Sequence, residues 1–125
     1  MNIIQGVVSS LNGEAAEVVW SEGKPPIRGM TGEGIAMGAT ASFVVRPEKV
    51  AITTEEPIET TNRVSGKVED IAYLGNMSTY YVRLDSGELI KSQVSNNRRI
   101  ARRGITWEDS VWLSWRDTAG IVLST

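Results

Sequence analysis

Short alternations of apolar and polar residues, separated by turn-forming residues, run along most of the chain. Residues 3–8 (IIQGVV) and 15–20 (AAEVVW) are rich in β-branched side chains, and the Asn12-Gly13 dipeptide between them suits the positive φ angles of a hairpin turn. Residues 41–45 alternate with a period of two, and residues 50–53 resume the β character after Arg46-Pro47. The first part of the chain is therefore predicted to hold a strand pair followed by two further strands.

A glycine- and proline-rich stretch, residues 21–38, interrupts these strands. Two prolines and five glycines are too dense for a long regular element, so we predict a loop with room for one edge strand. The series Gly32, Gly34, Gly38 is one residue longer than a G-x-G-x-x-G phosphate loop, and no helical pattern follows it. A flexible loop is favoured over a nucleotide cradle.

The second part of the chain repeats the rhythm of short strands and turns. A polar, acidic connector, TTEEPIETTN (53–62), precedes it and places an internal boundary near residue 60. The five strand-length segments after the boundary are 64–71, 79–84, 88–94, 110–115 and 120–123. The predicted fold is all-β: an OB-like five-stranded small barrel over residues 61–125, packed with a smaller N-terminal β unit over residues 1–60.

Two segments also suggest weak internal similarity between these halves. Residues 42–52 (SFVVRPEKVAI) and 111–123 (VWLSWRDTAGIVL) both give a strand, an arginine, a turn and a strand. In the second of these segments, Val111, Leu113 and Trp115 fall on one face by period two. The pattern favours two small β units packed together.

Composition excludes several classes of function. The 125 residues contain no cysteine and no histidine, which removes disulfides, the usual zinc sites, thiol nucleophiles and the commonest acid–base catalyst. The net charge of −2 gives no overall attraction to nucleic acid or anionic lipid. The sequence shows neither a signal peptide nor a long apolar run, so we expect a soluble cytoplasmic domain. No catalytic residue, metal site or cofactor is predicted.

The stretch NNRRIARRG (96–104) is the one local excess of charge. Arg98, Arg99, Arg102 and Arg103 are expected to lie in a solvent-accessible loop, because four guanidinium groups could not be buried without as many partners. Such a loop could contact phosphates, a small anion or an acidic protein surface. Tyr80 and Tyr81 are adjacent and point to opposite faces of a strand, so at most one of them is in the core.

Three stretches carry a resemblance to a known family: VRPEKVAI (45–52), GKVEDIAYLGNMSTYYVRLDSGELIKSQVSNN (66–97) and WEDSVWLSWRDTAGIVL (107–123). They resemble the C-terminal regulatory region of ABC-importer ATP-binding subunits, which contains the TOBE (transport-associated OB) domain, above all that of the spermidine/putrescine type. N-x-x-x-G at Asn2 to Gly6 is similar to the start of that region. The residues that match the family pattern, with structural roles expected, are Arg46, Pro47, Glu48, Tyr73, Gly75, Gly87, Asn96, Trp107 and Trp115.

The resemblance implies a non-catalytic regulatory and dimerisation domain. It implies a homodimer, contact with the ATPase domain of the same subunit and through it with importer membrane subunits, a possible small regulatory ligand, and a place at the inner face of the cell membrane. The phosphate loop, the LSGGQ-type signature and the catalytic glutamate of a whole ATP-binding subunit are not in this sequence. The chain therefore looks like a fragment or a separately produced domain.

A different class of function stays open from the residues alone. A free-standing OB-fold module that binds a small anion or single-stranded nucleic acid would also combine a five-stranded barrel, a basic loop and exposed aromatic side chains. Nucleic acid is the less favoured ligand, because aromatic side chains on small β domains more often mark protein interfaces. An uncharacterised hydrolase is disfavoured, because no nucleophile–base pair is recognisable.

Overall fold

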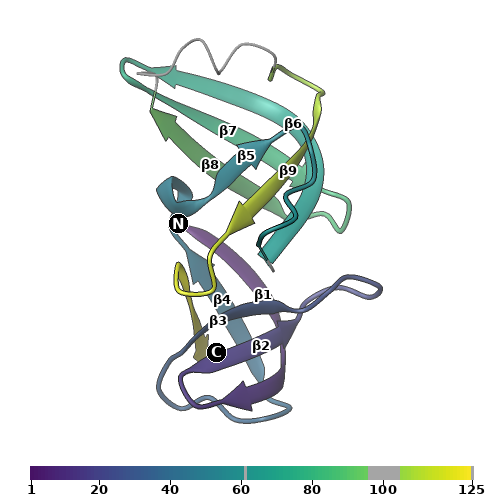
Figure 1. Ribbon diagram of the computed structural model, residues 1–125, viewed down its shortest axis with the longest axis vertical. Helices are drawn as coiled ribbons and strands as arrows, with labels where there is room; N and C mark the ends of the chain where they lie inside the picture. The colour runs from purple at the N-terminus through teal and green to yellow at the C-terminus, as the bar shows by residue number, and fades with distance from the viewer. Residues whose placement is uncertain (61, 96–104, 125) are drawn as a thin grey trace.

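The computed structural model describes residues 1–60, 62–95 and 105–124. In these residues the chain forms two groups of β-strands stacked along the long axis of the molecule (Figure 1). None of the described segments is a helix long and apolar enough to cross a membrane. In chain order, the elements are β1 (Asn2–Asn12), β2 (Ala15–Val19), β3 (Ile27–Thr31), β4 (Thr40–Val45), the 3-10 helix η1 (Pro47–Lys49), β5 (Ala51–Thr53), β6 (Asn62–Leu74), β7 (Met77–Leu84), β8 (Leu89–Ser95), β9 (Ser110–Trp115) and β10 (Gly120–Ser124).

The lower group in Figure 1 is a closed barrel of β1, β2, β3, β10 and β4, here called the first barrel. Its strands alternate buried apolar residues with outward-facing ones, as the period of two requires. Phe43 fills the centre and is fully buried. Gly120 and Gly29 leave room for it, since a Cβ on either would lie within 3 Å of the Phe43 ring, 2.3 Å and 2.7 Å away respectively.

The upper group is a curled sheet in the order β5-β9-β6-β7-β8, here called the second sheet. Helix η1 packs beside β8, near the side where β5 and β8 approach each other without pairing. Trp115 at the end of β9 stacks on Phe43 of the first barrel, with 5.8 Å between the ring centroids. The cores of the two groups are therefore continuous. The all-β, OB-like fold predicted from the sequence is confirmed.

The two groups exchange strands. The last strand, β10, pairs with β4 and with β3 of the first barrel, whereas β5 pairs with β9 of the second sheet. The prediction that residues 120–123 form the fifth strand of the second unit is therefore wrong. Period-two alternation identifies a strand but not its partner, and the buried Val122 of β10 lies opposite Phe43. The division at residue 60 as a domain boundary stays a prediction.

An approximate two-fold relation links the two halves of the chain. The first long strand of each half carries a β-bulge at the same distance from its start, between Val8 and Ser10 in β1 and between Val68 and Asp70 in β6. The exchange is reciprocal, because each half supplies four strands to one group and its fifth strand to the other. The weak similarity between residues 42–52 and 111–123 corresponds to the two connections that cross between the groups.

The loop before the fourth strand of each half, β4 in the first half and β9 in the second, obeys the same relation. Gly38 N donates to Val8 O at 2.9 Å, and Glu108 N donates to Val68 O at 2.7 Å. Gly38 has φ 78° and Glu108 has φ 69°, so both residues occupy the left-handed region. Only Gly38 does so without a side-chain penalty.

Candidate interaction surfaces

Two buried asparagines join the groups. Asn62, at the start of β6, donates from Nδ2 to Arg28 O and accepts at Oδ1 from Arg28 N, both at 2.8 Å. Asn2, at the start of β1, makes the same pair of 2.8 Å bonds to the backbone of Lys91 in β8. Each side chain thus acts as an extra strand residue for the opposite group, and the relative position of the two groups is fixed by directional bonds.

Sequence reasoning singled out Asn2 but missed Asn62. The signal was present, because N-x-x-x-G occurs at Asn2 to Gly6 and again at Asn62 to Gly66. Both glycines are required by close backbone approach: a Cβ on Gly6 would lie 2.3 Å from Val19 O, and a Cβ on Gly66 would lie 2.4 Å from Arg83 O.

An ionic contact reinforces the junction. The Arg28 guanidinium contacts Glu17 at 2.6 Å and Asp117 at 3.6 Å. The hydrogen bond that Arg28 donates to Glu17 is the main reason that the pKa of Arg28 is raised, and the charges of Glu17 and Asp117 act in the same direction. Asp117 lies on the turn between β9 and β10, so this contact ties the second crossing connection to the first barrel.

A cleft of about 270 Å³, here called the tryptophan cleft, separates the β2–β3 loop from the second sheet. Trp20 and Trp112 line it, and the Trp20 indole is fixed by donating to Pro25 O at 3.0 Å. Its charged groups occur as pairs, Lys24 with Asp85 at 3.6 Å and Arg63 with Glu56 at 3.1 Å. The β2–β3 loop therefore covers part of the outer surface of the second sheet, and the cleft has no net charge.

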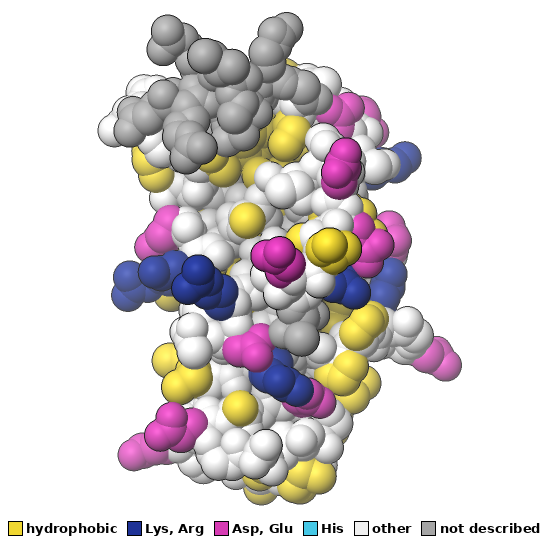
Figure 2. Space-filling model, viewed as in Figure 1, with side chains coloured by type: hydrophobic (Ala, Val, Ile, Leu, Met, Phe, Trp, Pro, Cys, Tyr) yellow, Lys and Arg dark blue, Asp and Glu magenta, His cyan; other side chains and the backbone are white. Residues whose placement is uncertain are grey.

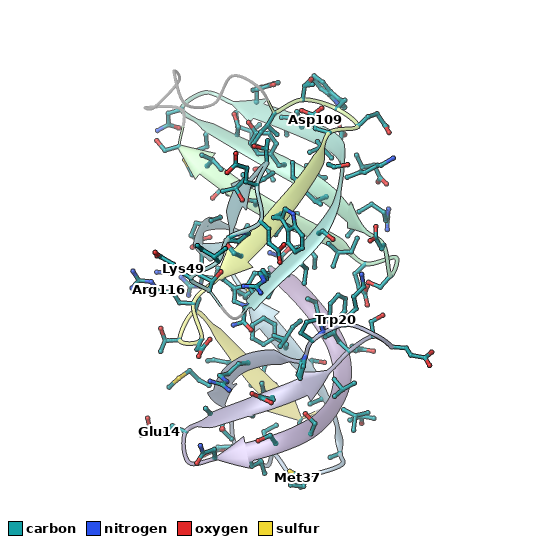
Figure 3. The ribbon with its side chains drawn as sticks, turned by 45° about the vertical axis from the view of Figure 1, so that its right-hand side comes forward. Glu14, Trp20, Met37, Lys49, Asp109 and Arg116 are labelled. Atoms are coloured by element: carbon teal, nitrogen blue, oxygen red, sulfur yellow. The ribbon has the colours of Figure 1, made fainter. Side chains whose placement is uncertain are left out.

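The two connections that cross between the groups carry cationic side chains. Figure 2 shows Lys and Arg side chains gathered at one side of the junction, and Figure 3 labels Lys49 and Arg116 there. Both residues line a wide depression of about 520 Å³ that Thr60 and Ser114 also line. Arg46 lies in the first connection, 3.8 Å from the carboxylate of Glu48.

Two exposed aromatic side chains lie at the far end of the second sheet. Tyr73, which is 62% exposed, meets Trp107 edge to face with 6.3 Å between the ring centroids. The Trp107 indole donates to Asp70 at 3.3 Å, and Asp109 accepts from Thr106 N at 2.9 Å. The ring of Trp107 is thereby held against the β6 bulge.

The residues that the family pattern selected lie at several separate places. Arg46, Pro47 and Glu48 form the first connection, and Gly75 and Gly87 sit at positive φ in the β6–β7 and β7–β8 turns. Tyr73 and Trp107 lie together, as described, and Trp115 is buried at the junction. Asn96 and the cluster Arg98, Arg99, Arg102 and Arg103 lie outside the described residues.

Burial agrees with the sequence pattern along two strands. Val111, Leu113 and Trp115 are buried on one face of β9. Tyr80 is buried in the core and Tyr81 is only half-buried, as expected for adjacent strand residues. Among the residues the structure describes, no group of three or more His, Cys, Asp or Glu side chains could hold a metal ion.

The family follows from comparison with known proteins. The family model described as "TOBE domain" matches residues 43–123, which include the whole second sheet, the last three residues of β4 and all but the last residue of β10 in the first barrel. The chain belongs to the TOBE domain family. The strand exchange explains why the matched residues span both groups.

Two relatives cover nearly all of this TOBE domain. It is 34% identical to "Putrescine transport ATP-binding protein PotG" of Escherichia coli K12 over 99% of the chain and 33% of that protein. It is 32% identical to "Spermidine/putrescine import ATP-binding protein PotA" of Nitrosospira multiformis over 95% of the chain and 35% of that protein. The chain thus spans about a third of the length of these curated relatives.

A solved structure shares the fold. The cytoplasmic molybdate-binding protein ModG, crystallised in a PEG-grown form with molybdate bound, superposes with a TM-score of 0.82 over 99% of this chain and 96% of that chain. The two sequences are 20% identical, so this similarity shows the fold alone.

Proposed function

We propose that this TOBE domain is the non-catalytic regulatory and dimerisation part of an ABC-importer ATP-binding subunit that serves polyamine uptake. The observation that carries the proposal is the match to PotG, which uses 99% of this chain and only 33% of the relative. A rigid two-group body supports it, since the bonds of Asn2 and Asn62 hold the outer surfaces in one arrangement.

The proposal defines the partners and the place of the domain. The ATPase domain of the same subunit is the direct partner, importer membrane subunits are reached through it, and the complex lies at the inner face of the cell membrane. The role of the domain is structural: it keeps two ATP-binding subunits together while they open and close. Solute choice belongs to other subunits.

A chimera tests this function. The aligned C-terminal third of E. coli PotG is replaced by this TOBE domain, and ATP-dependent putrescine uptake is measured in cells that lack PotG. We expect the chimera to restore uptake, whereas PotG truncated before the aligned region does not. A chimera that accumulates and binds ATP but gives no more uptake than the truncated protein would reject the assignment.

A second candidate function is the binding of a small anion at the crossing connections. Lys49 and Arg116 come from the two connections and line one depression, together with the hydroxyl-bearing Thr60 and Ser114 and with Glu48, whose carboxylate lies 3.8 Å from Arg46. Titration with molybdate and with sulfate, followed by NMR, tests this function. Saturable shifts at residues 46–50 and 116–119 that vanish in Lys49→Gln/Arg116→Gln support it, and shifts that disappear in moderate salt without saturation contradict it.

A further inference from the structure

One wall of the tryptophan cleft is a loop that is longer in the first half of the chain than in the second. The β2–β3 loop covers residues 20–26, whereas the related β7–β8 connection covers residues 85–88 and is a short turn around Gly87. Adjacent antiparallel strands are commonly joined by about two to five residues, so closing this hairpin does not require the extra length. The loop instead reaches the second sheet, where Lys24 contacts Asp85 of the related turn at 3.6 Å.

Indole rings from both groups of strands line the cleft. Trp112 stands on β9 beside Ser65 of β6, and Trp20 enters from the β2–β3 loop at the level of the junction (Figure 3). The 3.0 Å bond to Pro25 O fixes the Trp20 ring in place. The ring contacts of the described residues join other aromatic side chains, so Trp20 and Trp112 have no ring partner. Two preformed aromatic surfaces beside an open space suit a planar guest.

The charged side chains of the cleft are already paired. Lys24 contacts Asp85, as described, and Arg63 contacts Glu56 at 3.1 Å. Arg63 also donates to Thr60 O at 3.0 Å. A charged ligand would have to displace one member of such a pair and would leave the other member without its counterion. The cleft therefore favours an uncharged ligand over an anion or an amine.

Two uncharged polar groups of the cleft remain available. The Trp112 indole N–H and the Ser65 hydroxyl form no hydrogen bond within the part of the chain that the structure describes. Both groups donate, so they favour a ligand with an acceptor on its edge. The cleft volume of about 270 Å³ is close to the lower limit of roughly 300 Å³ for drug-sized pockets, which suits one ring or a fused pair.

We propose that the tryptophan cleft binds an uncharged heteroaromatic molecule of one or two rings, which stacks on Trp112 and accepts a hydrogen bond at its edge. The proposal goes beyond the proposed function and does not depend on it, because this chain contains every residue of the cleft. The bound ring contacts the β2–β3 loop of the first barrel and the second sheet together. Such a ligand stabilises the junction between the two groups, and the unfolding temperature rises with its concentration.

Nicotinamide is the probe, because it is an uncharged heteroaromatic ring with a carbonyl acceptor. Its binding to the whole chain is followed by NMR at the tryptophan indole N–H signals, which are assigned with single Trp→Phe variants. We expect saturable shifts at Trp20 and Trp112 and no shift at Trp107, which is exposed at the far end of the second sheet. Shifts that grow in proportion to concentration without saturation, or equal shifts at Trp107, would overturn the proposal.

Two variants and a control locate the site. Trp112→Ser removes the stacking surface and is expected to weaken nicotinamide binding at least about tenfold. Ser65→Ile keeps both indoles, places a strand-favouring residue on β6 and fills the floor of the cleft, so a comparable loss is expected. Trp107→Ser removes an exposed indole elsewhere and should bind as the wild type does. Unchanged affinity in a folded Ser65→Ile variant shows that the ligand does not occupy the cleft, whether or not Trp112→Ser folds.

Two further probes test the class of ligand. Nicotinate carries a carboxylate on the same ring and is expected to bind more weakly than nicotinamide, because the cations of the cleft are paired. N-acetyltryptophanamide represents an aromatic side chain of a partner protein and is also expected to bind more weakly. Equal affinity for nicotinate would reject an uncharged ligand, and tighter binding of N-acetyltryptophanamide would assign the cleft to a protein partner. If nicotinamide binds while the PotG chimera fails, the importer function is rejected and the ligand site stands.

Discussion

The side-chain amide of Asn62 takes the place of a neighbouring strand as the hydrogen-bond partner of the Arg28 backbone. These two bonds join the second sheet to the first barrel. We predict that Asn62→Ala destabilises the protein by roughly 1–3 kcal/mol, because the N–H and C=O of Arg28 lose their partners at a part-buried position. Urea denaturation measures the change. Gln5→Ala removes an exposed amide from β1 and is expected to stay within about 0.5 kcal/mol of the wild type. Equal effects of the two variants would show that the bonds of Asn62 contribute nothing.

Glu108 and Gly38 allow a matched test of backbone strain. Glu108→Gly is expected to stabilise the protein by about 0.5 kcal/mol, since relief of left-handed strain outweighs the added chain entropy of glycine. Gly38→Ala has room for its Cβ but places a side chain at φ 78°, so a loss of about 1 kcal/mol is expected. Thermal unfolding of both variants measures the two signs. A loss of stability in Glu108→Gly would mean that its side chain contributes more than its backbone costs.

Among the elements, the sequence identified most strands but not their partners. Residues 21–38 were predicted to be a loop with room for one edge strand; β3 lies there, but it pairs with both β2 and β10, and its Gly29 makes room for Phe43. The exchange of β10 could not be predicted, since alternation records which face of a strand is buried and not which sheet it joins. The same limit hid Asn62, whose partner Arg28 is distant in the sequence.

The exchange of β5 and β10 predicts how the halves behave when the connector is cut. A protease site inserted after Ile58, which is 86% exposed, separates the halves covalently. We expect both pieces to elute together in gel filtration, because each completes the strands of the other. The same nicked chain without residues 120–125 should separate at a lower urea concentration. Dissociation of the nicked full chain in plain buffer would contradict a joint core.

At the scale of the whole molecule, the missing phosphate-loop motif leads to a prediction about nucleotide binding. The sequence has neither a phosphate loop nor its lysine, so we predict no saturable binding of ATP with magnesium up to millimolar concentration. Isothermal titration calorimetry measures this directly, and the PotG chimera under the same conditions serves as the positive control. Saturable micromolar binding by the isolated chain would require a different account of the domain.

The strand exchange also sets when folding can finish during translation. The first barrel closes only when β10 joins β3 and β4, and β10 is made after every other described strand. The edges of β3 and β4 therefore remain open while the second sheet is being synthesised, a state that favours chaperone binding. Ribosome-stalled chains that end before Gly120 should stay sensitive to protease within residues 27–45. Chains stalled with Ser124 already outside the exit tunnel should be protected there.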